Sequence, residues 1–170
     1  MGRGGIRPLE FKTFSKEMQN AITNYCQAGG NFFVSGAYVA SDLWDNRLEK
    51  ANEEDKKFAM EVLKYKWRVG QAARNGKVKS VASPFPEITG SYTYYQDLNP
   101  ESYVVESPDA LEPAAQGAFT ILRYSENNLS AGIAYKGNYK TCVLGFPFEA
   151  IRTVTERELL MKAILTFFEH

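Results

Sequence analysis

The sequence predicts an α/β domain that has a parallel strand early and an antiparallel meander late. Three observations support this class. A helix-spaced apolar stripe within residues 13–28 leads through two glycines into the short apolar run 31–35. Later, three apolar runs alternate with short polar turns, as the strands of a meander do: 119–124, 130–135 and 140–146. The chain ends in another helix-spaced apolar stripe.

Length and composition fit one domain. The 170 residues are enough to bury a hydrophobic core, and we assign residues 13–170 to a single domain and the Gly- and Arg-rich residues 1–12 to a flexible N-terminus. The 20 Lys and Arg residues balance the 20 Asp and Glu residues, which argues against a nucleic-acid partner. No apolar stretch reaches the length of a membrane span, and the N-terminus has no signal-peptide core.

The first helix is expected to run to about Ala28, with Thr13 or Ser15 as its cap. Gly29 and Gly30 then stop it, because glycine adopts the left-handed conformation that ends many helices. Its apolar stripe consists of Phe14, Met18, Ala21, Ile22, Tyr25 and Cys26.

The run 31–35 is short, apolar and rich in aromatic and β-branched residues, which predicts a parallel-type strand covered on both faces. A tight turn at Gly36 should follow it. Ser41 should then cap a short helix that runs to Trp44.

Four further elements are expected in the middle of the chain. A second helix covers about residues 52–66, with an acidic first turn that suits the helix dipole. Asn75-Gly76 predicts a hairpin between the short runs on either side. Residues 91–98 are an aromatic strand candidate, and the proline-punctuated segment 104–114 is expected to be a long loop.

The final helix carries a capping box formed by Thr155 and Glu158. The residues of its apolar stripe are Leu159, Leu160, Ala163, Ile164, Phe167 and Phe168.

Two cysteines and one histidine limit the chemistry. Cys26 and Cys142 lie in apolar, periodic segments and are interpreted as small buried residues, with a disulfide left open. The only histidine is the last residue, His170, which argues against a histidine base, a histidine-ligated zinc or a Ser-His-Asp triad. We therefore expect no metal and no cofactor.

A resemblance adds to this description. The segment "YCQAGGNFFVSGAYVASDLW" is similar to the helix, buried strand and sharp elbow of class I glutamine amidotransferase-like domains. Together with "VVESPDALEPA", "ILRYSENNLSAGIAYKG" and "VLGFPFEAI", it resembles the C-terminal region of Bacteroidetes proteins labelled xanthan lyase or golvesin-like. The resemblance covers roughly residues 11–168 and implies a three-layer, flavodoxin-like sheet. It also implies a larger exported parent protein.

The resemblance implies a lost active site. Active amidotransferases carry Gly-x-Cys-x-Gly at the elbow, whereas this chain has Gly36-Ala37-Tyr38-Val39-Ala40, which puts Tyr38 in the nucleophile position. Where the catalytic His and Glu would stand, only Glu149 remains, next to Phe148. Relatives have further β-α units before the first helix, so this domain is expected to be partial. The exposed edge of the 31–35 strand would then favour a homodimer.

The elbow admits two interpretations. In the structural one, Gly36 supplies backbone freedom, Ser41 caps the helix and Asp42 suits its dipole. In the functional one, a residual pocket lies at the carboxyl end of the strand, where the helix N-terminus can hold an anion or hydroxyl. The binding candidates are Ser35, Gly36, Tyr38, Ser41 and Arg123, and the catalytic candidates are Tyr38, Asp42 and Glu149.

Three acids, Glu106, Asp109 and Glu112, lie close together in the segment 104–114. Paired carboxylates can act on glycosides or hold Ca²⁺, but this spacing fits no known motif. We interpret Glu106-Ser107-Pro108-Asp109 as a turn with solvated acids.

Three functional hypotheses follow. In the preferred one, the domain is catalytically silent and serves a larger exported protein as a structural module or as one that binds a glycan or peptide. In the second, it is a hydrolase or lyase of extracellular or cell-wall polysaccharide that uses Tyr38, Asp42, Glu106 and Glu149. In the third, it is a gene fragment without independent function.

Overall fold

The computed structural model describes residues 13–44 and 52–170. Its helical segments are α1 (Lys16–Gln27), α2 (Ser41–Trp44), α3 (Glu53–Lys57), a π-helical segment η1 (Phe58–Leu63), a 3₁₀ turn η2 (Phe148–Ala150) and α4 (Val154–Glu169). Its strands are β1 (Phe32–Ser35), β2 (Tyr65–Val69), β3 (Lys77–Ser80), β4 (Ser91–Thr93), β5 (Ala110–Pro113), β6 (Ala118–Tyr124), β7 (Ser130–Lys136) and β8 (Lys140–Leu144). The flexible N-terminus expected over residues 1–12 lies outside the described residues.

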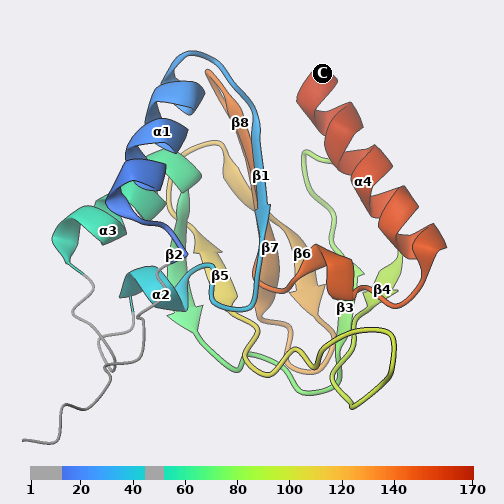
Figure 1. The fold of residues 1–170 in the computed structure, drawn as a ribbon. Coiled ribbons are helices and arrows are strands. Elements are labelled where there is room, and N and C mark those ends of the chain that lie inside the picture. Colours follow the sequence, from blue (N-terminus) through green and yellow to red (C-terminus); the bar gives the residue numbers. More distant parts are fainter. Residues whose placement is uncertain (1–12, 45–51) are drawn as a thin grey trace, which may run out of the picture.

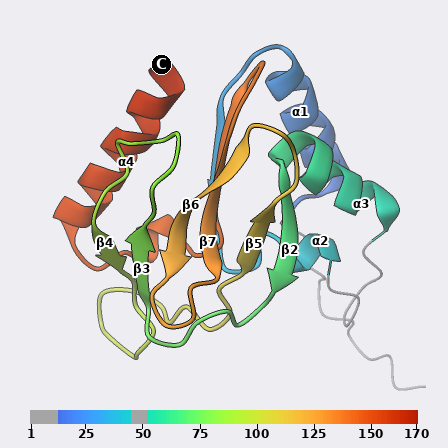
Figure 2. The same cartoon turned by 180° about the vertical axis from the view of Figure 1, so that it is seen from behind.

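A mixed six-stranded sheet in the order β1-β8-β7-β6-β3-β4 forms the centre of the molecule, and β2 and β5 form a separate antiparallel pair. The predicted meander is confirmed, because β6, β7 and β8 pair antiparallel in succession. Figure 1 shows α1 and α4 on opposite sides of the sheet, and Figure 2 shows the pair β2-β5 from behind. The α/β class expected from the sequence is therefore present.

Alternate residues of the central strands feed two hydrophobic cores. On the α4 side, Cys142 and Leu144 of β8 share a core with Ile164. On the α1 side, Val143 of the same strand shares a core with Ile22. This alternation follows from the two-residue period of a strand, which sends neighbouring side chains to opposite faces.

Helix α1 forms as predicted, with the Ser15 hydroxyl accepting a hydrogen bond from the Met18 backbone N–H at 3.3 Å. Its predicted apolar stripe is partly wrong. Met18 and Tyr25 are exposed. Gln19 is buried instead, and its amide donates a 2.7 Å hydrogen bond to Oδ1 of Asp55. A partnered polar side chain has replaced an apolar one on the covered face of the helix.

Strand β1 pairs parallel with β8, as a parallel-type strand was expected to do. Both faces of β1 are packed as predicted, since Phe33 lies against the core on the α4 side and Phe32 and Val34 lie against the core on the α1 side. The burial is only partial, however, because all four residues of the strand are half-buried. β1 stands at one end of the sheet order and has one neighbour among the described residues. A short apolar run does not reveal whether its strand lies in the middle of a sheet or at the edge.

The helix predicted over 52–66 ends early. It stops at Leu63, because Lys64 adopts a left-handed conformation with φ of 69°, and the chain continues directly as β2. The partner of β2 is β5, which lies inside the segment 104–114 that was predicted to be a loop. Both errors have one cause: neither short strand is stable until the other is beside it.

The hairpin predicted at Asn75-Gly76 is also absent, since β2 and β3 belong to different sheets. Gly76 does have a positive φ of 61°. It uses this conformation to accept a 2.8 Å hydrogen bond from the Tyr94 backbone N–H. The glycine therefore brings the chain against the segment after β4. That strand ends at Thr93, well short of the expected residue 98.

Helix α4 begins two residues earlier than predicted. Thr153 is its N-cap, and the Thr153 hydroxyl accepts a 3.1 Å hydrogen bond from the Glu156 backbone N–H. The pattern Thr-x-x-Glu occurs twice in succession here, and the sequence does not distinguish the two. Leu159, expected in the apolar stripe, is exposed, whereas Leu160, Ala163, Ile164 and Phe167 are buried.

Candidate functional site

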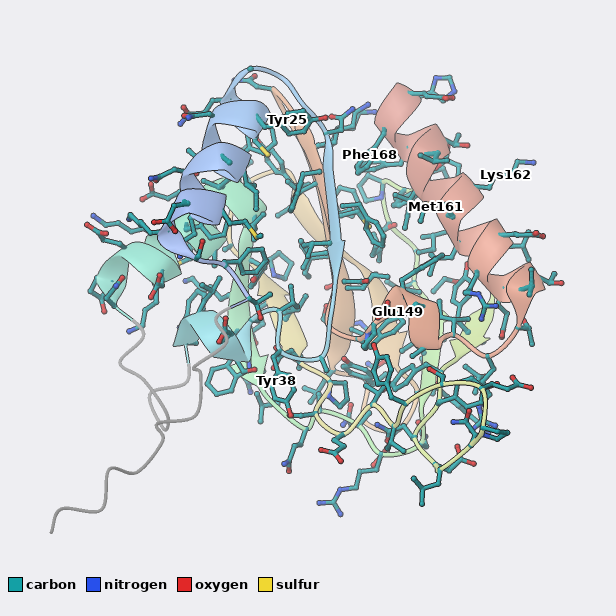
Figure 3. The ribbon with its side chains drawn as sticks, viewed as in Figure 1. Tyr25, Tyr38, Glu149, Met161, Lys162 and Phe168 are labelled. Carbon is teal, nitrogen blue, oxygen red and sulfur yellow. The ribbon has the colours of Figure 1, made fainter. Side chains whose placement is uncertain are left out.

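A cavity of about 270 Å³ lies where β1 and β8 end. Because these strands are parallel, the turn after β1 and the turn after β8 meet at the same edge of the sheet. Gly36, Ala37 and Tyr38 come from the first turn, and Pro147 and Glu149 come from the second. The segment 103–106 completes the lining with Tyr103, Val104, Val105 and Glu106. Figure 3 shows Tyr38 and Glu149 at this end of the sheet. We call this space the elbow cavity.

The elbow cavity combines two tyrosines with two carboxylates. Tyr38 is 53 % exposed and Tyr103 is 52 % exposed, so both rings are open to solvent. The Tyr103 hydroxyl donates a 2.6 Å hydrogen bond to Oε1 of Glu149. Burial, followed by this hydrogen bond and the Glu149 charge, raises the pKa of Tyr103 well above its ordinary value. Tyr103 therefore stays protonated and acts as a donor rather than a base.

Among the described residues, no lysine or arginine belongs to the lining of the elbow cavity. Glu106 and Glu149 thus give it negative character, which disfavours anionic ligands. Its remaining surface comes from Ala37, Val104, Val105 and Pro147. The cavity therefore offers apolar surface, aromatic rings and hydrogen-bond acceptors.

Asp109 fixes the turn after β1 from the interior of the protein. It is fully buried, and its Oδ2 accepts hydrogen bonds from the backbone N–H of Ala40 at 2.8 Å and of Ser41 at 2.9 Å. The Ser41 hydroxyl lies 3.2 Å from the same oxygen, and Nε1 of Trp67 donates to Oδ1 at 3.0 Å. The sequence predicted that the N-terminus of α2 could hold an anion, and the Asp109 carboxyl group of the protein itself occupies that position.

Burial raises the pKa of Asp109 from its ordinary value of 3.8 to about 7, and the hydrogen bonds from Ser41, Ala40 and Trp67 offset part of that rise. The prediction that the acids of segment 106–109 are solvated is therefore wrong for Asp109. Only the strand residues that follow it, Ala110 and Leu111, could have indicated that it lies in the interior.

The backbone of Asp109 also ties the two turns together. Its N–H donates to the Gly145 carbonyl at 2.7 Å, and its carbonyl accepts a 2.7 Å hydrogen bond from the Tyr124 hydroxyl. A Cβ at Gly145 would lie 2.0 Å from the Asp109 carbonyl oxygen, so only glycine fits there. Gly36 is different: its φ is not positive, and a Cβ there would meet nothing closer than 3.8 Å. The prediction that Gly36 supplies backbone freedom is wrong.

The other candidates are spread over several places. Ser35 accepts a 3.1 Å hydrogen bond from the Phe148 backbone N–H and so links β1 to η2. Ser41 is buried against Asp109, and Asp42 accepts a 2.6 Å hydrogen bond from the Thr13 backbone N–H. Arg123 is absent from the elbow cavity and lines a second cavity instead. The structure therefore brings together Gly36, Tyr38, Glu106 and Glu149, and leaves out Ser35, Ser41, Asp42 and Arg123.

Both cysteines lie away from this site. Cys26 and Cys142 are buried and unpaired, in agreement with the interpretation of small core residues. Burial raises the pKa of each thiol. Within residues 13–44 and 52–170, no group of three or more His, Cys, Asp or Glu side chains is placed to hold a metal ion. None of the helices described is both long and apolar enough to span a membrane.

Comparison with known proteins gives a fold and no family. No protein-family model matches the chain, and no curated protein matches it. Among solved structures, a β-galactosidase from Rahnella sp. R3 is similar to this chain, with a TM-score of 0.57 and 13 % sequence identity. The similarity covers 91 % of this chain and 21 % of the β-galactosidase chain. The chain therefore shares its fold with about a fifth of that enzyme.

An exo-β-1,4-mannosidase, Op5Man5 from Opitutaceae bacterium strain TAV5, is similar over 91 % of this chain and 22 % of its own. The identity is 10 % and the TM-score is 0.48, which is too low to show a shared fold.

Proposed function

We propose that this chain is a catalytically silent, amidotransferase-like domain that binds a neutral glycan in its elbow cavity. We further propose that it serves as a module of a larger exported protein. The observation that carries the proposal is the meeting of Tyr38, Tyr103, Glu106 and Glu149 in one cavity at the ends of β1 and β8. Two helical layers around a central sheet are compatible with the three-layer topology that the resemblance implies.

The chemistry of the lining favours a sugar. A tyrosine ring offers an apolar face to the C–H groups of a pyranose, and carboxylates accept hydrogen bonds from its hydroxyls. The negative lining disfavours acidic polysaccharides such as those a xanthan lyase acts on. The name of the β-galactosidase that shares the fold is in keeping with a neutral sugar ligand. Because the chain spans only a fifth of that enzyme, its activity is not transferred.

The proposed lack of catalytic activity is argued from the residue at the nucleophile position. The resemblance implies that Tyr38 stands there in place of a cysteine, and both thiols of the chain are buried elsewhere with raised pKa values. Tyr103 supplies the other hydroxyl of the cavity; its pKa is raised, and no cation from residues 13–44 or 52–170 lines the cavity to lower it. A lyase needs a base that these groups do not provide.

Titration calorimetry with neutral oligosaccharides tests the binding. Tyr38→Ala should weaken binding about tenfold, because it removes one stacking face. Tyr25→Ala is the matched control, since Tyr25 is 54 % exposed on α1 and lies outside the cavity. Equal affinity of the two variants, absence of binding by any neutral glycan, or binding of peptides alone would contradict the proposal.

One observation favours hydrolysis of a glycoside as a second candidate. Glu106 and Glu149 line the same cavity, and two carboxylates are the minimal set for glycoside hydrolysis. If the domain is a hydrolase, it should release reducing sugar from a neutral oligosaccharide, and Glu106→Gln or Glu149→Gln should abolish the release. Glu158→Gln, an exposed position on α4, is the control. No release by the unaltered protein would leave the silent domain as the function.

A further inference from the structure

A second cavity, of about 450 Å³, lies between the β2-β5 pair and the strands β6 and β7. Figure 2 shows these four strands side by side. Its lining residues are Arg68, Leu111, Glu112, Pro113, Thr120, Arg123, Asn128, Leu129 and Ser130. None of them belongs to the elbow cavity. We call this space the arginine cavity.

The arginine cavity has an excess of positive charge. Arg68 from β2 and Arg123 from β6 both line it, against one carboxylate, Glu112. Lys79 of β3 stands directly across from Arg123 in the antiparallel pairing. Like charges at directly opposite positions destabilise a sheet, and a bound anion relieves that cost. The two lining arginines therefore favour an anionic ligand, and Lys79 adds positive charge on the neighbouring strand.

Both guanidinium groups keep donors for a ligand. Nη1 of Arg68 is 3.1 Å from Oε1 of Glu112, and both side chains are about half exposed, at 59 % and 48 %. Such an exposed pair contributes little and can rearrange around a ligand. Nη1 of Arg123 donates a 2.6 Å hydrogen bond to the Asn128 carbonyl, which positions the group. A guanidinium has five N–H donors, so most of them remain available.

The floor of the arginine cavity combines hydroxyl groups with apolar surface. The Thr120 hydroxyl donates to the Ser130 hydroxyl at 3.2 Å, and the Ser130 hydroxyl in turn donates to the Gly132 carbonyl at 3.4 Å. Ser130 and Leu111 are buried, and Leu129 is partly so. Hydroxyl oxygens beside two guanidinium groups suit a ligand that carries both a carboxylate and hydroxyls.

We propose that the arginine cavity is a second binding site, which takes the carboxylate of an acidic sugar such as a uronic acid. An arginine binds a planar carboxylate through two parallel N–H donors, as a single lysine cannot. The hydroxyls of the sugar lie near Thr120 and Ser130, and its C–H groups face Leu129. The domain thus has two sugar sites of opposite charge preference.

Titration of the ¹⁵N-labelled protein with D-glucuronate, followed by NMR, tests this site. The amide signals of Thr120, Asn128 and Ser130 should shift, and added salt should weaken the binding. Arg123→Gln should weaken it about tenfold, because a charge-assisted pair is lost. Glu112→Gln should strengthen it about threefold, because a repelling carboxylate is removed. Each variant should keep the dispersed spectrum of a folded protein, because Arg123 and Glu112 are not core residues.

Three controls decide the interpretation. Lys162→Gln removes a cation from α4, outside the cavity, and should leave the affinity unchanged. D-glucose should not shift these signals, and acetate or inorganic phosphate should bind more weakly than D-glucuronate. Equal binding of D-glucose, acetate or phosphate overturns the assignment, as does unchanged affinity in Arg123→Gln. Tyr38→Ala should leave D-glucuronate binding intact, so this site and the elbow cavity succeed or fail independently.

Discussion

Asp109 connects turns that are distant in the sequence. Its side chain holds the backbone of Ala40 and Ser41, and its own N–H reaches Gly145 in the turn after β8. The position of Tyr38 therefore depends on a carboxyl group almost 70 residues away, since the Ala40 contact has a separation of 69. Asp109 is not itself a lining residue of the elbow cavity, and it acts by positioning the turns that line it.

The raised pKa of Asp109 predicts a pH-dependent stability. Between the unfolded value of 3.8 and the folded value of about 7, only the folded state holds the proton. The free energy of unfolding should therefore fall as pH rises from about 4 to 7, by up to about 1.4 kcal/mol per pH unit from this group. Urea unfolding at several pH values measures the slope.

Asp109→Asn isolates this contribution, because an amide does not titrate. The variant should lose the decline between pH 4 and 7 relative to the unaltered protein. Asp97→Asn, at an exposed aspartate paired with Arg152, provides the control. The same slope in Asp109→Asn and in the unaltered protein would show that Asp109 does not carry the proton.

At the scale of single elements, the sequence before α4 contains two possible N-caps for that helix. Thr153 and Thr155 are both followed by a glutamate three residues later. The structure uses only the first pair as a cap, with Thr153 in an extended conformation. The chain has to leave η2 and the β-bridge between Tyr94 and Ile151 before the helix begins. That constraint places the helix start at Val154.

Thr153→Ala should lower the free energy of unfolding by about 1 kcal/mol, because the Glu156 backbone N–H loses its acceptor. Thr155→Ala is the matched variant. It lies within the exposed first turn and should change stability by less than about 0.5 kcal/mol. Thermal or urea unfolding of the two variants compares them directly. A larger loss of stability in Thr155→Ala would contradict the assignment of the cap to Thr153.

At the scale of the whole molecule, β1 is an edge strand that carries the elbow. Within the described residues it has β8 as its one neighbour. An edge strand presents unpaired backbone groups that can pair with another strand. Pairing through this edge would place two elbow cavities on one assembly.

The homodimer expected through this edge stays a prediction. Light scattering after size exclusion should give twice the monomer mass at high protein concentration. Hydrogen exchange of the β1 amides should slow in the same range of concentration, because pairing protects them. A monomer at every concentration, or a dimer whose β1 amides exchange freely, would contradict pairing through β1.

The sequence by itself determined the local elements that have strong local signals. Helix α1 with its double glycine and the β6-β7-β8 meander follow from periodicity, capping and turn residues. The short helix α2 also forms where it was expected, but Ser41 is its first residue, and the Ser41 hydroxyl contacts Asp109 instead of capping the helix. The sequence also named Gly36, Tyr38 and Glu149 as candidates, and these three residues line one cavity. For these residues the signal was a resemblance, which carries tertiary information that periodicity lacks.

Only the tertiary structure decided the rest. The pairing of β2 with β5 and the burial of Asp109 both depend on segments far away in the chain. The same holds for Tyr103, which reaches Glu149 across 46 residues, and for Arg123, which lies in a cavity of its own. The physical reason is that short strands and buried charges are stable only when their distant partners are in place, and a local pattern does not name those partners.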